Sequence, residues 1–135
     1  MAASKSNIAL VRAGFEALNA GDLDACIELV KPDLIINLAE LPEPLHGRDI
    51  WRQGAAMFRR AFPDLHAEIE DIFGSGDRVA VRLSMSGTHR GDYLGIPATG
   101  RPVSYVSHEF YRVQDGLIAE EWLCSDTASL LRQIS

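Results

Sequence analysis

The stretch Leu65-His-Ala-Glu-Ile-Glu70, followed by Val79-Ala-Val-Arg-Leu-Ser-Met-Ser86, decides the fold of this chain. Apolar and polar residues alternate in both segments, and a period of two is typical of strands with one buried face. Before Pro63 the apolar residues instead recur every three or four positions, as they do in amphipathic helices. The sequence therefore predicts helices in its first half and an antiparallel sheet in its second half.

Turn and cap residues divide both halves into shorter elements. Asp22 and Asp49 are predicted N-caps, and Gly21, Pro32 and Pro63 are predicted to end the helices before them. We expect helices over 6–20, 24–30 and 49–62, an early strand over 34–39, a long loop over 87–102, paired strands over 103–113 and 117–124, and a short final helix from 126. Helices first and a sheet afterwards predict an α+β fold, in which the sheet curves over the first helix and leaves a pocket.

Composition sets the class of protein. The chain has 135 residues, 47% of them hydrophobic and 24% charged, which is enough for one domain spanning 1–135 with its own core. Its net charge of -6 argues against nucleic-acid and membrane partners. Cys26 and Cys124 form no CxxC pair, and no stretch approaches the roughly 20 apolar residues of a membrane span, so a reduced, cytoplasmic setting is expected.

Short sequence blocks follow one another in a fixed order from Ala61 to the end of the chain. They are Ala61-Phe-Pro-Asp-Leu65, Gly76-Asp-Arg-Val-Ala-Val-Arg82, Gly87-Thr-His89, Gly95-Ile-Pro-Ala-Thr-Gly100, Tyr111-Arg-Val113, Asp115-Gly116, Glu120 with Trp122, and Leu130-Leu-Arg-Gln133. In order and spacing they resemble the SnoaL-like polyketide cyclase family. The resemblance covers about the whole chain, although before Ala61 only Gly47-Arg48-Asp49 and the pattern of the first helix match.

This resemblance implies a fold and a chemistry. The fold is a cone-shaped α+β barrel of the superfamily that contains nuclear transport factor 2 and ketosteroid isomerase. The chemistry is an intramolecular aldol condensation that closes a ring of a polyketide ester, with no metal or organic cofactor. Matched to the family pattern, Asp126 is the general acid/base and His108 on the preceding strand is its electrophilic partner. A shared fold alone does not establish a reaction.

The turn between the last two strands determines whether these two residues share a face. With a three-residue loop at Gln114-Asp-Gly116, His108 lies opposite Trp122 and on the same face as Asp126. With a two-residue loop, Asp126 lies opposite Tyr105, on the face away from His108. We favour the three-residue loop. Burial of Asp126 beside Trp122 would raise the carboxyl pKa toward the range that acid/base catalysis needs near neutral pH.

The remaining candidates are expected to bind substrate. Asn37 stands where many members of the wider family carry a histidine, and its amide can hydrogen-bond a substrate carbonyl. His89 lies in the glycine-rich loop. The four histidines form no HExxH motif, so no metal site is expected. The candidates for the lining of an apolar or aromatic substrate pocket are Phe15, Asn37, Trp51, Phe58, Met85, His89, Phe110 and Trp122.

Each candidate also has a purely structural explanation. Asp126 directly precedes the last helix and is equally suited to be its N-cap. His108 fits a hydrogen-bonded core or surface residue, and the aromatic residues fit the hydrophobic core. Alternatives to a cyclase are therefore a small-molecule-binding protein without catalytic activity and a related hydroxylase or isomerase.

A second apolar strip predicts self-association. Val103, Tyr105, Tyr111 and Val113 alternate with the residues proposed for the pocket, so we expect them on the opposite face of the sheet. An exposed apolar strip of this size is typical of a surface that another subunit covers. We therefore expect a homo-oligomer, either a dimer or a tetramer.

Overall fold

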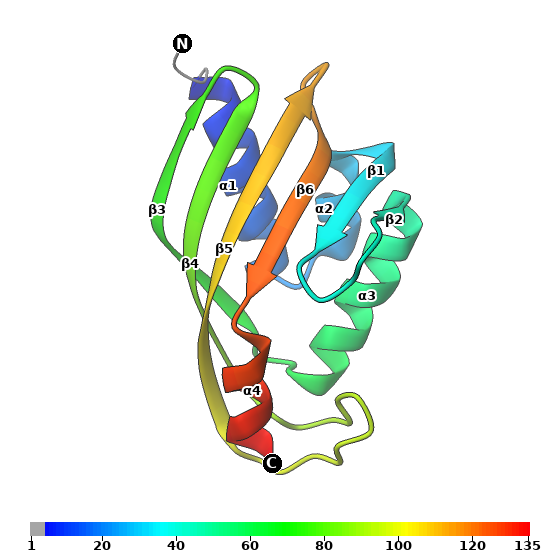
Figure 1. Cartoon of the computed structure of the whole chain (residues 1–135), viewed down its shortest axis with the longest axis vertical. Coiled ribbons are helices and arrows are strands. Elements are labelled where there is room, and N and C mark those ends of the chain that lie inside the picture. Colours follow the sequence, from blue (N-terminus) through cyan, green and yellow to red (C-terminus); the bar gives the residue numbers. More distant parts are fainter. Residues whose placement is uncertain (1–4) are drawn as a thin grey trace.

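Ten helices and strands make up the described part of the protein, residues 5–135 of a computed structural model (Figure 1). The helices are α1 (Lys5–Asn19), α2 (Leu23–Glu28), α3 (Arg48–Ala61) and α4 (Thr127–Ile134). The strands are β1 (Val30–Leu38), β2 (Leu45–His46), β3 (His66–Ser75), β4 (Arg78–Thr88), β5 (Pro102–Gln114) and β6 (Leu117–Ser125). The predicted change from helices to strands after Pro63 is confirmed.

The strands form one curved, six-stranded sheet in the order β2-β1-β6-β5-β4-β3. Neighbouring strands run antiparallel except β1 and β6, which are parallel. In Figure 1, α1 and α2 lie behind this sheet, α3 lies beside β1 and β2, and α4 follows the end of β6. The predicted α+β architecture is confirmed, although β2 and β3 remain edges and the curved sheet does not close into a barrel.

The two predicted helix caps have different outcomes. Asp22 caps α2 as predicted, and its carboxylate accepts a hydrogen bond of 3.0 Å from the amide of Ala25. Asp49 does not cap α3. The helix begins at Arg48, one residue before the predicted start, and Gly47 is its N-cap. Gly47 has a φ of 102°, a left-handed conformation that turns the chain from β2 into the helix and that glycine adopts without strain.

The hairpin between β5 and β6 differs from the predicted one. Gln114 pairs with Leu117, so the loop has two residues, Asp115 and Gly116, with φ values of 54° and 75°. A bulge after Arg112 then shifts the register by one residue. As a result His108 lies opposite Cys124, and its predicted position opposite Trp122 is wrong.

The predicted faces of β5 are reversed in the structure. Register explains why: Tyr111 pairs with Val79 and Tyr105 pairs with Met85, and paired residues point to the same side of a sheet. Because the buried face of β4 fixes the buried face of β5, the strip expected to be exposed lies in the core instead. That strip consists of Val103, Tyr105, Tyr111 and Val113.

Candidate functional site

A cavity of about 380 Å³ lies between the inner face of the sheet and the helices α1 to α3. Most of its lining is apolar or aromatic. The lining includes residues of α1, α3 and β4 that the sequence predicts to bind substrate. Within the described residues, its charged lining consists of Glu40, Glu109 and Glu121, with no lysine, arginine or histidine. The cavity therefore suits an uncharged apolar ligand and repels an anionic one.

The alternation of β5 and β6 directs two carboxyl groups into this cavity. Glu109 is in phase with Tyr105 and Tyr111 on β5, and Glu121 pairs with Tyr111 from β6. Both glutamates are buried. Two buried carboxyl groups with no cation in the described lining cannot both carry a full negative charge at low cost, so one of them must hold a proton.

Hydrogen bonds show which member of the pair carries the charge. The Ser107 hydroxyl donates to Oε2 of Glu109 at 2.6 Å, and the Tyr111 hydroxyl donates to its Oε1. Burial raises the pKa of Glu109, while these two donors act in the opposite direction. Both oxygens of Glu109 therefore accept hydrogen bonds, as those of a carboxylate do.

Glu121 is the member that holds the proton. It is 3% exposed, and its Oε1 is buried without a hydrogen-bond partner among the described residues. Burial, and next the negative charge of Glu109, raise the pKa of Glu121 to about 8. At neutral pH Glu121 is mostly a carboxylic acid, and once ionised it is a stronger base than an exposed glutamate.

Tyrosines complete the polar side of the cavity. Tyr105 is buried beside this pair, and burial raises the pKa of its hydroxyl well above the usual value. Tyr93 reaches the lining from the long loop between β4 and β5 and packs edge-on against Phe58 and Phe62, with ring centroids 5.4 Å apart in each case. Both tyrosines stay neutral and can donate hydrogen bonds to a ligand.

Half of the residues predicted to bind substrate do line the cavity. Phe15 comes from α1, Trp51 and Phe58 from α3, and Met85 from β4. His89 does not line it. Its ring is fully buried, accepts a hydrogen bond at Nδ1 from the amide of Thr99, and packs on Phe62. His89 thereby anchors the start of the loop that carries Tyr93.

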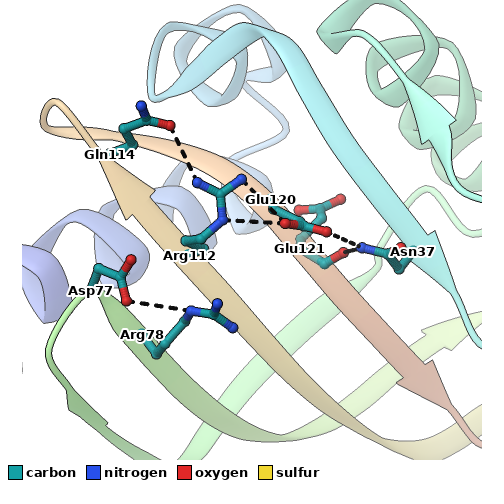
Figure 2. A network of polar contacts seen from close by, with 7 residues as sticks. All are labelled: Asn37, Asp77, Arg78, Arg112, Gln114, Glu120 and Glu121. Atoms are coloured by element: carbon teal, nitrogen blue, oxygen red, sulfur yellow. Dashed lines mark hydrogen bonds and ion pairs between the residues drawn. The ribbon is translucent and has the colours of Figure 1, made fainter.

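The other predicted residues lie on the outer face of the sheet. His108 is exposed there, and Phe110 is 54% exposed opposite Trp122, over whose ring Arg78 stacks at 5.1 Å. Figure 2 shows the adjoining polar network, in which the Asn37 amide donates to the carboxylate of Glu120 and to the backbone carbonyl of Glu121. The reversal of the β5 faces explains why His108 and Phe110 lie on the outer face. Tyr105 and Tyr111 point inward, so the residues that alternate with them point outward.

Asp126 lies at the start of α4 and is the N-cap of that helix, the structural explanation given for it above. Its carboxylate accepts a hydrogen bond of 3.1 Å from the amide of Ser129, and the residue is exposed. The structure therefore brings neither Asp126 nor His108 into the cavity lining.

The sequence contains a signal for one of the two cavity glutamates, Glu109. Along β5 the residues Tyr105, Ser107, Glu109 and Tyr111 share one phase of the alternation, so a glutamate lies among residues of the buried face. A carboxyl group in the buried phase of a strand points to a functional site, because its burial costs stability. The reversed assignment of the faces hid this signal.

Comparison with known proteins agrees with this fold. The model of the SnoaL-like polyketide cyclase family matches residues 8–134. This chain belongs to that family. Aklanonic acid methyl ester cyclase DnrD of Streptomyces peucetius is 30% identical to it over 132 residues, which are 96% of this chain and 90% of that protein.

Solved structures show the same relationship. IdmH of Streptomyces antibioticus, a suggested polyketide cyclase, is 35% identical with a TM-score of 0.83, over 96% of this chain and 98% of that one. AclR of Streptomyces galilaeus, a suggested hydroxylase, is 29% identical with a TM-score of 0.89, over 98% of this chain and 82% of that one. Proteins similar to this chain thus carry more than one suggested activity, and the activity has to follow from the residues of the cavity.

Two further findings describe the chain outside the cavity. Among residues 5–135, no three His, Cys, Asp or Glu side chains converge in a way that could hold a metal ion. None of the helices in the same range is both long and apolar enough to cross a membrane.

Proposed function

We propose that this protein closes a ring of an uncharged polyketide or β-dicarbonyl ester by intramolecular aldol addition, with Glu121 as the general acid/base. The observation that carries the proposal is the pair of buried carboxyl groups, Glu109 and Glu121, in an otherwise mostly apolar cavity. The acidic lining supports a neutral ester over a free acid. The 30% identity to a cyclase named for a methyl ester supports the same class of substrate.

The proposed reaction needs one group that takes a proton and returns it. Ionised Glu121 removes a proton from the carbon between two carbonyls, and the resulting enolate attacks a ketone carbon of the same molecule. A carbon–carbon bond forms, the ketone becomes an alkoxide, and Glu121 returns the proton to that oxygen. The product has the mass of the substrate. With a pKa of about 8, about a tenth of Glu121 is ionised at pH 7.

Glu109 supports this step without contacting the reacting carbon. Its negative charge raises the pKa of Glu121 and so strengthens Glu121 as a base. The hydroxyls of Ser107 and Tyr111 keep that charge in place. Tyr105, neutral and buried in the lining, can donate a hydrogen bond to the oxygen on which charge develops.

The test is incubation with aklanonic acid methyl ester, followed by mass spectrometry and carbon NMR. Ring closure predicts a product of unchanged mass with one ketone signal fewer. A gain of one oxygen atom would indicate a hydroxylase instead, and a recovered substrate that nevertheless raises the melting temperature would indicate a binding protein. The matched variants are Glu121→Gln and Glu120→Gln, because Glu120 lies on the outer face of the same strand.

We further propose that the protein forms a homo-oligomer through the outer face of the sheet. The original reason for expecting one no longer holds, because the strip that includes Tyr105 and Tyr111 is buried within one chain. Support now comes from exposed apolar side chains on the outer face, namely Phe73, Val106 and Phe110. Either a dimer or a tetramer agrees with one face that self-associates.

A further inference from the structure

A chain of hydrogen bonds connects the Glu109 carboxylate with Ser125, a residue of the cavity lining. Ser107 donates to Glu109, and the Ser107 and Ser125 hydroxyl oxygens are 2.8 Å apart, which places them in hydrogen-bond contact. Ser107 and Ser125 are cross-strand partners on β5 and β6. Of the two serines, Ser125 lines the cavity and Ser107 is buried behind it.

The chemistry of the donors fixes the direction of this chain. A hydroxyl has one proton to donate, and the Ser107 proton points at Glu109, which as a carboxylate can only accept. Ser107 therefore accepts from Ser125, and the proton of Ser125 points away from the cavity toward Ser107. What Ser125 presents to the cavity is an oxygen with free lone pairs, which is a hydrogen-bond acceptor.

We propose that Ser125 is a specificity-determining residue whose hydroxyl oxygen accepts a hydrogen bond from a hydroxyl group of the substrate. This proposal rests on the proposed function, because it names a feature of the same polyketide substrate. Within the described residues, Ser107 is the hydrogen-bond partner of the Ser125 hydroxyl, so a ligand donor meets no competitor there. A methoxy group or a carbonyl at this point would place two acceptors against each other.

The spacing along β6 indicates which part of the substrate Ser125 contacts. Ser125 and Glu121 are four residues apart on one strand, and at about 3.3 Å per residue their Cα atoms are about 13 Å apart. A substrate whose reacting carbon lies at Glu121 thus places a different part of its skeleton against Ser125. Ser125 selects a hydroxylated ring and takes no part in bond formation.

Binding of simple tricyclic probes tests the proposal without turnover. Calorimetry measures Kd for 2-hydroxyanthraquinone and 2-methoxyanthraquinone, whose polar groups are too far from the quinone oxygens to bond internally. The wild-type protein is expected to bind the hydroxy probe about five- to tenfold more tightly, the effect of one neutral hydrogen bond. Ser125→Ala should reduce that ratio to about one. The control Ser84→Ala, the same change on the outer face of β4, should preserve it.

A second variant tests the direction of the chain. In Ser107→Ala the proton of Ser125 is free to rotate into the cavity, so binding of the methoxy probe should improve and the preference should fall. A wild-type protein that binds both probes equally or neither, or a Ser125→Ala variant that keeps the wild-type ratio, would overturn the proposal. Ring closure is measured separately, so a hydroxyl preference without turnover would count against the proposed function alone.

Discussion

Replacing Glu121 by glutamine should remove a large pH dependence of stability. In the unfolded chain this carboxyl titrates near 4.5, and in the folded protein its pKa is about 8. Between these values the folded state binds one more proton than the unfolded state, so the free energy of unfolding falls as pH rises and levels off above about pH 8. Because one pKa unit corresponds to about 1.4 kcal/mol, the wild-type protein should lose about 3 to 5 kcal/mol across this range.

Glutamine has nearly the same shape as protonated glutamic acid but has no proton to lose. Glu121→Gln should therefore match the wild-type protein near pH 5 and become more stable than it at pH 8.5, by about 3 to 5 kcal/mol. The assay is urea denaturation at pH 5, 6, 7, 8 and 8.5, with the difference between variant and wild type plotted against pH, which cancels other titrating groups to first order.

Glu120→Gln is the control for this experiment. Glu120 lies one residue away on the outer face, in a salt bridge of 3.2 Å with Arg112, and its loss should produce no such rise with pH. If Glu121→Gln and the wild-type protein lose stability in parallel from pH 5 to 8.5, Glu121 is not protonated in the folded state. The assignment of the proton to Glu121 and of the charge to Glu109 would then be wrong.

Three further substitutions test the positions of other residues. Asp126→Ala should cost about 1 kcal/mol of stability through loss of the α4 cap while ring closure per folded molecule persists, and abolished turnover in a stable variant would instead return Asp126 to the reaction. Phe110→Arg should lower the molar mass seen in sedimentation to that of a monomer, and an unchanged oligomer would place the interface elsewhere. Gly91→Ala should lower the free energy of unfolding by about 1 to 3 kcal/mol, because a Cβ would lie 2.3 Å from the Arg60 carbonyl oxygen, and an unchanged melting curve would show that the loop yields.

Local patterns were sufficient to predict most of the elements. The alternation from Val79 to Met85 is buried on the predicted side, and Asp22 caps the predicted helix. These features depend on neighbours along the chain, which a sequence displays directly. The parallel pairing of β1 with β6 depends on segments more than 80 residues apart, and no local pattern specifies it.

The candidate site shows where local patterns fail. On β5 both phases contain apolar residues, with Tyr105 and Tyr111 in one and Val106 and Phe110 in the other. Alternation therefore shows that a strand exists without showing which face is buried. The pairing of Val79 with Tyr111 decides the face, and the bulge after Arg112 sets the phase of β6. Glu121 becomes a candidate only once both are known.

The pH dependence of ring closure reports directly whether Glu121 is the catalytic base. For the wild-type protein, kcat/KM for the ester should rise about tenfold per pH unit below pH 7 and level off near pH 8, because the ionised form of Glu121 is the base. Glu121→Gln should lower it by about 100-fold or more across this range, while Glu120→Gln retains it. A rate that levels off near pH 4.5, or a Glu121→Gln variant as active as the wild-type protein, would show that Glu121 is not the base.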